Sequence, residues 1–144
     1  MDIVIQSGQR TGSVRVPSSK SQAHRALILA ALGSKPSSIL IDGISKDIEA
    51  TIACLNAIGA DIKVCEGRIL VTPVKRGCPG SRLLSCGESG STLRFMLPIV
   101  GALGVEAEFL PEGRLMERPL SPLDQCLRRH GMIIEKTSDR ILCS

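Results

Sequence analysis

Two halves of this sequence repeat one another. The pattern Cys-Leu-x-x-x-Gly begins at Cys54 and again at Cys126, and an Arg-Ile-Leu triplet follows each copy at the same interval, at Arg68 and at Arg140. An Ala-Leu-Gly triplet upstream also recurs, at nearly the same offset. Because chance rarely produces three matches in the same order, we interpret them as an internal duplication. Two units of equal length account for the full length of 144 residues.

Each unit has the hydrophobic pattern of two helices and four strands. Short apolar runs between turn residues predict strands, and apolar residues recurring every three or four positions predict helices. In the first unit the predicted strands cover 13–16, 38–41, 61–64 and 68–71, and the helices cover 19–32 and the stretch between Ser45 and Gly59. In the second unit the strands lie near 82–85, 105–110, 133–136 and 140–143, and the helices lie near 91–103 and from Ser121 onward.

These elements predict an α/β (α+β) fold in which a β-α-β-α-β-β unit is used twice. Unit one extends over residues 12–73 and unit two over residues 82–144. The intervening residues 74–81 belong to a stretch rich in Pro and Gly, which favours a linker.

The last helix of unit two has recognisable start signals. Ser121 is a typical N-cap residue, and Pro122 suits the first helical position. Helical spacing gives this helix one face made of Leu123, Cys126, Leu127 and His130. We expect that face to pack toward the core.

Composition excludes several classes of protein. Hydrophobic residues make up 43% of the chain and charged residues 22%, a balance that excludes intrinsic disorder. Phe95 and Phe109 are the only residues of the types Phe, Trp and Tyr, so recognition of nucleic acid by base stacking is nearly excluded. The net charge of +4 comes without dense basic runs, which is typical of a solvated surface.

The cysteines point to a reduced cytoplasmic protein without a metal site. None of the six cysteines forms a Cys-x-x-Cys pair, and neither histidine has ligand-like spacing to a cysteine, so no zinc site is expected. The N-terminal residues lack the pattern of a signal peptide, and no apolar run is long enough for a membrane span. Reduced thiols in the cytoplasm are therefore the simplest interpretation.

Positive charge at the starts of apolar helices is the feature that points to function. A helix N-terminus carries partial positive charge and normally attracts Asp and Glu. The first helix opens instead with Lys20, Ser21 and Arg25, of which Ser21 and Arg25 share a face. Cations, hydroxyls and free backbone N–H groups together are typical of an anion site. The alternative is that Lys20 and Arg25 extend over apolar surface to water.

Two further segments have an anion-binding character. A Gly-Ser turn opens the second apolar helix, where Gly90 lets a ligand approach the backbone and Arg94 lies one turn further on. Arg114 and Arg118 stand four positions apart in a loop between Gly and Pro, which suits contacts with carboxylate or phosphate. The alternatives are a purely structural turn at Gly90 and a surface ion pair between Arg118 and a nearby glutamate.

No catalytic set for hydrolysis is apparent. His24 is interpreted as a polar helix residue and not as a base. Asp42, Asp47 and Asp61 are interpreted as turn or cap residues. Glu88 is the one carboxylate inside a candidate site, and its sign opposes the binding of phosphate.

The candidate segments resemble, in the same order, the N-terminal part of the 5-enolpyruvylshikimate-3-phosphate (EPSP) synthases. The resemblance rests on the motifs Val16-Pro17-x-Ser19-Lys20-Ser21-x-x-x-Arg25-Ala26-Leu27, Gly90-Ser91-x-x-Arg94 and Gly113-Arg114-x-x-x-Arg118-Pro119, and it extends over essentially the whole chain. This family has a two-domain fold with three β-α-β-α-β-β units in each domain. The resemblance therefore implies that the chain is a fragment holding about two units of an incomplete domain, with a first strand near Ile3–Gln6 that belongs to the other domain.

The resemblance implies a reaction as well as a fold. In the family, the 5-hydroxyl of shikimate 3-phosphate attacks phosphoenolpyruvate, a tetrahedral adduct forms, and phosphate leaves without the help of a metal or an organic cofactor. Both substrates are small anions, so several cations must converge on them. The implied partners are these two molecules, and neither nucleic acid nor a membrane is expected.

Motif positions imply roles for individual residues. Lys20 is the implied catalytic residue. The implied contacts of shikimate 3-phosphate are Lys20, Ser21 and Arg25. The implied contacts of phosphoenolpyruvate are Lys20, Gly90 through its backbone, and Arg114. The secondary candidates are Arg94 and Arg118.

The second motif departs from the family pattern. Members of the family commonly have Asn-Ala-Gly-Thr where Glu88-Ser89-Gly90-Ser91 stands here, and Glu88 adds negative charge near the anion site. The family's catalytic carboxylate and its later lysine and arginines would lie beyond Ser144. We therefore expect no turnover from this chain alone, and association through the face that the missing units leave exposed.

Two other functions stay open at this point. The enolpyruvyl transferase that acts on UDP-N-acetylglucosamine shares the architecture, but it prefers a Lys-Asn pair where Lys20-Ser21 stands. A non-catalytic anion- or nucleic-acid-binding module of the same architecture would bind with an affinity that falls steeply with salt.

Overall fold

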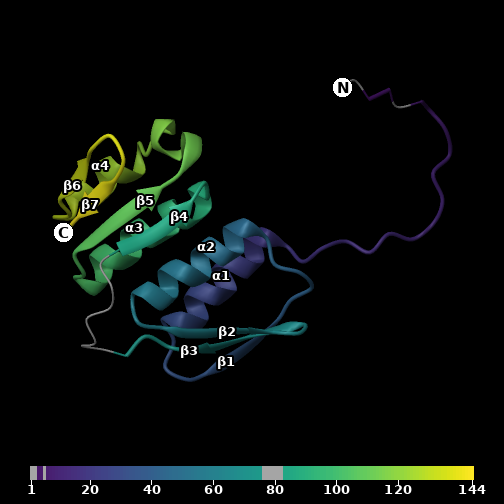
Figure 1. Cartoon of the computed structure of the whole chain (residues 1–144), viewed down its shortest axis with the longest axis horizontal. Helices are drawn as coiled ribbons and strands as arrows, with labels where there is room; N and C mark the ends of the chain where they lie inside the picture. Colours follow the sequence, from purple (N-terminus) through teal and green to yellow (C-terminus); the bar gives the residue numbers. More distant parts are fainter. Residues whose placement is uncertain (1–2, 5, 76–82) are drawn as a thin grey trace.

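The computed structural model describes residues 3–4, 6–75 and 83–144 (Figure 1). The helices in this part of the chain are α1 (Lys20–Ala31), α2 (Lys46–Ala57), α3 (Gly90–Leu103), the 3-10 helix η1 (Gly113–Glu117) and α4 (Leu123–Arg129). The strands are β1 (Ser37–Leu40), β2 (Asp61–Cys65), β3 (Arg68–Thr72), β4 (Leu83–Gly87), β5 (Ala107–Pro111), β6 (Ile134–Lys136) and β7 (Ile141–Cys143).

The strands form two sheets in a mixed α/β fold. Sheet A has the order β1-β3-β2 with antiparallel neighbours, and sheet B has the order β4-β5-β7-β6, in which only β4 and β5 are parallel. The pairing repeats with the sequence. Val64 lies opposite Ile69 in sheet A, and Lys136 lies opposite Ile141 in sheet B, which are the equivalent positions of the second repeat. The duplication in the sequence therefore recurs as identical strand register.

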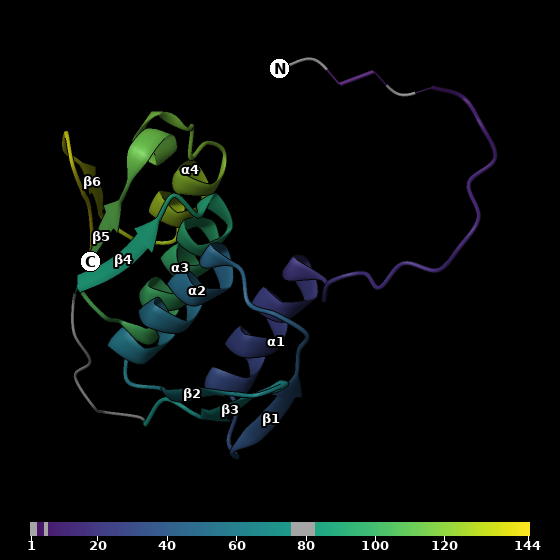
Figure 2. The same cartoon turned by 45° about the vertical axis from the view of Figure 1, so that its right-hand side comes forward.

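Three helices lie between the two sheets and build the core. Helices α1 and α2 cover one face of sheet A, and α3 packs against sheet B (Figures 1 and 2). Helix α2 contacts α1 on one side and α3 and β4 on the other. The core is almost entirely aliphatic, as the lack of aromatic residues predicts, with Leu27, Leu55 and Leu97 fully buried beside Phe109.

Two buried cysteines meet where the repeats are packed together. The Sγ of Cys54 on α2 lies 3.9 Å from the Sγ of Cys86 on β4. The Cys54 thiol also donates to the backbone carbonyl of Ser85 at 3.3 Å. Helix α2 and strand β4 are thus in contact through their thiols as well as through aliphatic side chains.

The first two helices start near the predicted positions, and a serine caps each of them. The Ser19 hydroxyl accepts a hydrogen bond from the Gln22 N–H, and the Ser45 hydroxyl accepts one from the Ile48 N–H. Each bond satisfies a backbone donor that the helix leaves free. The strands predicted over 61–64 and 68–71 are also formed, and they pair as the antiparallel strands β2 and β3.

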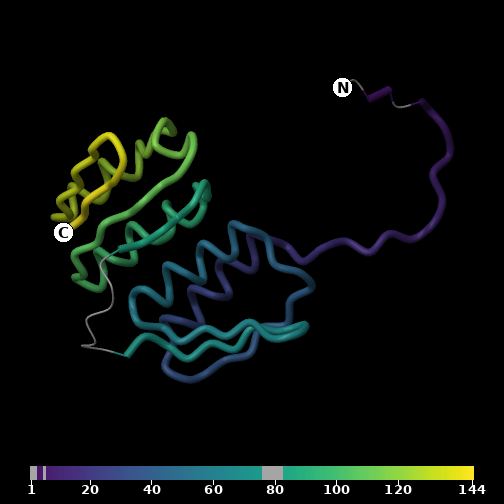
Figure 3. Tube along the Cα trace, viewed as in Figure 1, coloured from purple at the N-terminus to yellow at the C-terminus, as the bar shows by residue number. Residues whose placement is uncertain are grey.

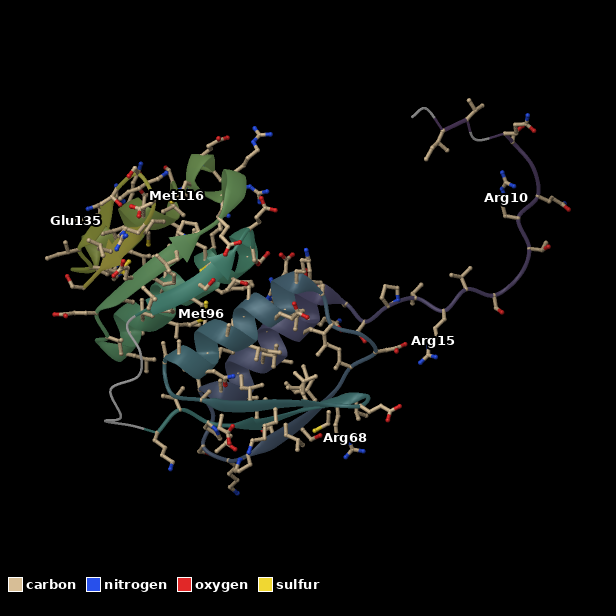
Figure 4. The ribbon with its side chains drawn as sticks, viewed as in Figure 1. Arg10, Arg15, Arg68, Met96, Met116 and Glu135 are labelled. Atoms are coloured by element: carbon tan, nitrogen blue, oxygen red, sulfur yellow. The ribbon has the colours of Figure 1, made fainter. Side chains whose placement is uncertain are left out.

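The prediction of a strand over residues 13–16 is wrong. These residues are part of an extended segment that leads away from α1, with Arg10 and Arg15 projecting from it (Figures 3 and 4). Val14 and Val16 alternate as in a strand, but they are 87% and 75% exposed because no core face receives them. The segment is held by an ion pair between Arg15 and Asp42 (2.7 Å) and not by pairing with β1.

The last helix differs from the prediction in its start and in its burial. Pro122 and not Ser121 occupies the N-cap position of α4, and no side chain caps the helix. The Ser121 hydroxyl accepts instead from the Gln125 side-chain amide at 3.1 Å. Of the predicted apolar face, Leu123 and Leu127 are half-buried, and the other two residues are exposed, because no element covers that side of this seven-residue helix. The exposed pair is Cys126 and His130.

Parts of three predictions lie outside the described residues. They are Ile5 of the strand expected near Ile3–Gln6, residues 76–81 of the expected linker, and Arg82 at the expected start of unit two. Within the described part of the chain, no helix combines the length and the apolar character needed to cross a bilayer.

Candidate functional site

The starts of α1, α2 and α3 surround one polar pocket. The pocket has a volume of about 460 Å³. Its lining residues are Lys20, Asp47, Glu88, Gly90, Ser91, Arg94 and Arg118. Three of them are cations from separate segments: the start of α1, the first turns of α3 and the residue after η1. We call this the anion pocket.

The backbone adds positive charge to the anion pocket. Neither α1 nor α3 has an acidic residue in its first turn. The Ser89 hydroxyl caps α3 by accepting from the Thr92 N–H at 3.2 Å, so the remaining N–H groups of the first turn stay free. Such helix starts attract anions.

Lys20 is paired with Asp47 across the anion pocket. Its Nζ lies 2.5 Å from Oδ2 of Asp47. The hydrogen bond from Lys20 is the main reason that the pKa of Asp47 lies below its ordinary value, and the nearby Ser89 hydroxyl lowers it further. Asp47 is therefore ionised near neutral pH and holds the Lys20 ammonium at the edge of the pocket.

Gly90 allows two guanidinium groups to approach the start of α3. A Cβ at this position would lie 2.7 Å from one nitrogen of Arg94 and 3.2 Å from one of Arg118. Arg94 donates to the Gly90 carbonyl at 3.1 Å and to the Pro119 carbonyl at 2.8 Å, which ties α3 to the segment after η1. Any side chain at position 90 would displace these cations.

Glu88 is a second carboxylate in the anion pocket. Its side chain lies over Gly113, where a Cβ would come within 1.8 Å of the Glu88 Oε1. Gly113 also has a φ of +53°, so glycine is required there for conformation and for space. Among the described residues, no cation forms an ion pair with Glu88. The pocket therefore contains one paired and one unpaired carboxylate.

Ser21 and Arg25 lie beside the anion pocket and do not line it. Arg25 donates to the Ser21 carbonyl at 2.8 Å, and its guanidinium carbon lies 5.2 Å from the centre of the Phe95 ring. This cation–π contact joins α1 to α3.

Arg114 lies apart from the anion pocket. Its side chain is 87% exposed, and its Nε donates to Glu117 at 3.2 Å. The 3-10 helix turns Arg114 outward and buries Leu115 instead. Of the two arginines in this loop, only Arg118 reaches the pocket.

Sequence reasoning missed the polar residues beneath the anion pocket. His24, Thr51, Thr92 and Ser89 are all buried. The sequence predicts His24 only as a polar helix residue, but it lies in the interior, where burial lowers its pKa below the ordinary value. Asp47 is more than the predicted cap or turn residue. Its pairing with Lys20 joins residues 27 positions apart, and no local signal indicates such a contact.

Within the described residues, no group of three or more His, Cys, Asp and Glu side chains is arranged to hold a metal ion. The groups at the anion pocket are cations, carboxylates, a hydroxyl and backbone N–H groups. These groups can bind and orient a carboxylate or a phosphate and can stabilise negative charge that develops on it.

Comparisons with known proteins show the family of the chain. The model of the family EPSP synthase (3-phosphoshikimate 1-carboxyvinyltransferase) matches residues 4–143. The 3-phosphoshikimate 1-carboxyvinyltransferase of Clostridium kluyveri is 41% identical over 110 residues, which cover 76% of this chain and 26% of that enzyme. The enzyme of the same name from Brachyspira hyodysenteriae is 33% identical over 148 residues, with 100% of this chain and 34% of that enzyme covered.

A solved structure shares the fold. The EPSP synthase of Acinetobacter baumannii superimposes with a TM-score of 0.80 at 22% identity, covering 91% of this chain and 31% of that one. The chain spans 26–34% of the length of these relatives. Because the family model matches residues 4–143, the chain belongs to the EPSP synthase family.

Proposed function

We propose that this chain supplies part of the substrate site of an EPSP synthase. Such an enzyme transfers the enolpyruvyl group of phosphoenolpyruvate to the 5-hydroxyl of shikimate 3-phosphate and releases phosphate. One observation carries the proposal: the cations Lys20, Arg94 and Arg118 meet two helix N-termini at a single pocket. Both substrates are anionic, and this arrangement suits carboxylate and phosphate groups.

The proposed contacts follow the geometry of the anion pocket. Lys20 can reach ligands from its edge and is our candidate for contact with both substrates. Gly90 offers its backbone to phosphoenolpyruvate, with Arg94 and Arg118 as neighbouring cations. Their positions favour a role closer to the substrate than the sequence motifs alone indicated.

Three further residues are proposed to contact the substrates, although they do not line the anion pocket itself. Ser21 and Arg25 are our candidates for shikimate 3-phosphate, which would then extend past the anion pocket along α1. Arg114 contacts phosphoenolpyruvate only after its side chain leaves Glu117. An exposed pair of this kind contributes about 0–1 kcal/mol, so the rearrangement costs little.

The main requirement of the enolpyruvyl transfer is the stabilisation of negative charge on the reacting groups. The 5-hydroxyl loses its proton as it attacks the central carbon of phosphoenolpyruvate, and the methylene carbon takes up a proton to become a methyl group. The C–O bond to phosphate then breaks while this methyl group gives up a proton, which restores the C=C bond of the enolpyruvyl group. The fixed cations of the pocket stabilise negative charge on the departing phosphate. The proposal includes no metal and no organic cofactor, and from the cysteine pattern it places the protein in the cytoplasm.

Calorimetric titration with shikimate 3-phosphate tests the proposal. The chain and its Lys20→Ala variant are titrated at fixed ionic strength, and Lys63→Ala serves as a control because Lys63 pairs with Asp61 on sheet A, away from the anion pocket. Inorganic phosphate in place of the substrate separates specific binding from general anion binding. Circular dichroism confirms that each variant is folded.

We expect saturable binding that Lys20→Ala weakens about tenfold or more and that Lys63→Ala leaves unchanged. Equal loss in both lysine variants would reduce the interaction to net charge. Preference for UDP-N-acetylglucosamine would favour the sibling enolpyruvyl transferase, and a steep salt dependence with nucleic acid would favour a binding module.

A further inference from the structure

A chain of buried polar side chains runs beneath the anion pocket and joins its three helices. His24 on α1, Thr51 on α2, Thr92 on α3 and the cap residue Ser89 are between 0% and 3% exposed. The His24 Nδ1 lies 2.7 Å from the Thr51 Oγ1, which lies 2.8 Å from the Thr92 Oγ1. The Thr92 hydroxyl in turn donates to the Ser89 Oγ at 2.8 Å. We call these four residues the buried relay.

The buried relay ends at Asp47. Both threonine hydroxyls lie within hydrogen-bond distance of the Asp47 backbone carbonyl, at 3.3 Å for Thr51 and 3.2 Å for Thr92. The Ser89 hydroxyl interacts with the Asp47 carboxylate and favours its ionised form. That carboxylate holds the Lys20 ammonium. The relay therefore connects an interior histidine to the ion pair at the edge of the anion pocket.

The hydrogen bonds of the buried relay have a direction, which depends on the group that donates the proton in each of them. Each hydroxyl has one proton to donate, and the Thr51 hydroxyl lies within hydrogen-bond distance of the His24 Nδ1, the Thr92 hydroxyl and the Asp47 carbonyl. A relay in which each group donates to the next, from His24 through Thr51 and Thr92 to Ser89, has the hydrogen of the neutral His24 ring on Nδ1. The Nε2 atom of His24 is buried and has no hydrogen-bond partner among the described residues, so the relay does not continue beyond this end.

Folding alone does not explain these polar residues. A buried polar network stabilises a fold no better than well-packed apolar side chains of the same size, and an incompletely satisfied one is costly. The unpartnered nitrogen of His24 is such a cost. Networks of this kind instead specify one arrangement of the elements they join.

We propose that the buried relay positions the Asp47 carboxylate and thereby the Lys20 ammonium for anion binding, an inference that rests on the proposed function of the pocket. The four relay residues are positioning residues, since none of them needs to touch a substrate. When an anion draws Lys20 away, the Ser89 hydroxyl still solvates the Asp47 carboxylate. Lys20 thus has two defined partners, Asp47 in the free pocket and the anion in the occupied one.

Substitutions that remove single hydroxyls test the proposal. Thr51→Val and Thr92→Val keep the shape of the side chain and delete its hydrogen bonds, and Thr137→Val is the matched control in the exposed turn between β6 and β7. The first readout is the ¹⁵N–¹H signal of the Lys20 ammonium, which is detectable because the bond to Asp47 slows its exchange with water. The second readout is the affinity for inorganic phosphate.

We expect both relay variants to shift the Lys20 signal toward that of exposed lysines and to speed its exchange. Phosphate binding should weaken about fivefold, the loss of one net hydrogen bond, and Thr137→Val should change neither readout. Thr51→Ser and Thr92→Ser retain the hydroxyl and should restore both, which separates positioning from general packing.

The nitrogen shifts of the His24 ring give a test that needs no substitution. The proposal requires the tautomer with hydrogen on Nδ1, and a ring protonated on Nε2 alone would overturn it. An unchanged Lys20 signal in folded valine variants would overturn it equally. If the wild-type chain binds no anion while the Lys20 signal responds as expected, the proposed function fails and the relay stands.

Discussion

The two repeats share their strand register but differ in what covers their second helix. Helix α2 of the first repeat is packed between α1, α3 and β4, and five of its 12 residues are buried. Helix α4 of the second repeat has seven residues, none of them buried. The difference lies in α3 and β4 of the second repeat, which pack against α2.

The first helices of the two repeats, α1 and α3, are both covered by neighbouring elements. They differ in the groups that their starts offer to the anion pocket. Ser19 and Ser89 cap α1 and α3 with the same hydrogen bond. The residue after the cap is Lys20 in α1 and Gly90 in α3. One helix start therefore presents a side-chain cation and the other its bare backbone, and the two meet at one pocket. The two repeats share their fold, and differences at single positions give their helix starts different binding groups.

The largest expected effect concerns equivalent leucines of the two second helices. Leu55 on α2 is fully buried, whereas Leu127, its counterpart on α4, is half-buried. Leu55→Ala should lower the free energy of unfolding by about 2–5 kcal/mol, because it leaves a cavity in the core. Leu127→Ala should cost about 1 kcal/mol or less. Denaturant unfolding followed by circular dichroism measures both, and equal losses would contradict the difference in covering.

Serine caps give the next comparison. Ser89 caps α3 and is buried, whereas Ser121 precedes α4 without capping it. Ser89→Ala should destabilise the chain by about 1–2 kcal/mol, and Ser121→Ala by a few tenths of that or less. Thermal unfolding of the two variants decides the matter. A larger loss at Ser121 would mean that its bond to Gln125 contributes more than the cap of α3.

Glu88 sharpens the comparison of the two helix starts. The residue that stands immediately before the cap is Ser18 in the first repeat and Glu88 in the second. Glu88→Gln removes the unpaired carboxylate from the anion pocket and should tighten the binding of inorganic phosphate about threefold at low salt. Glu66→Gln, in the turn between β2 and β3, makes the same change of charge at a distance. If both variants bind equally, the effect belongs to net charge alone.

The smallest expected effect is a pH dependence carried by the first repeat. Burial lowers the pKa of His24 from its ordinary value of 6.5, so the unfolded chain takes up a proton more readily than the folded one as the pH falls. Stability should therefore decrease as the pH falls through about 6.5, and His24→Gln should remove this slope. His130→Gln, a change in the exposed histidine of the second repeat, should leave it in place. Unfolding experiments at several pH values measure the slope, and its persistence in His24→Gln would assign it elsewhere.

Local patterns were enough to predict most elements of the fold. The serine caps and periodic apolar residues of α1 and α2 are signals within a few positions, and the structure has both helices. The strand predicted over 13–16 shows the limit of such signals. Val14 and Val16 alternate correctly, but a strand needs a partner edge and an apolar face to cover, and neither property is encoded in so short a segment.

The candidate site likewise contains residues that the sequence motifs indicated and residues that they did not. Motif spacing brought out Lys20, Gly90, Arg94 and Arg118, which line one pocket because they open helices or follow them. It did not indicate the exposed position of Arg114, which depends on the turn of a short 3-10 helix. Nor did it indicate the buried relay. Its residues are distributed over three helices, and only packing brings them within hydrogen-bond distance.

The buried thiols of Cys54 and Cys86 can report on the opening of the contact between the two repeats. They lie 3.9 Å apart between α2 and β4, and contact with Cys54 together with burial raises the pKa of the Cys86 thiol. A thiol reagent can modify them only while that seam is open, whereas Cys65 and Cys126 are exposed and react at once. The labelling rate of Cys54 and Cys86, compared with that of Cys65 and Cys126, therefore reports how often the contact between α2 and β4 opens.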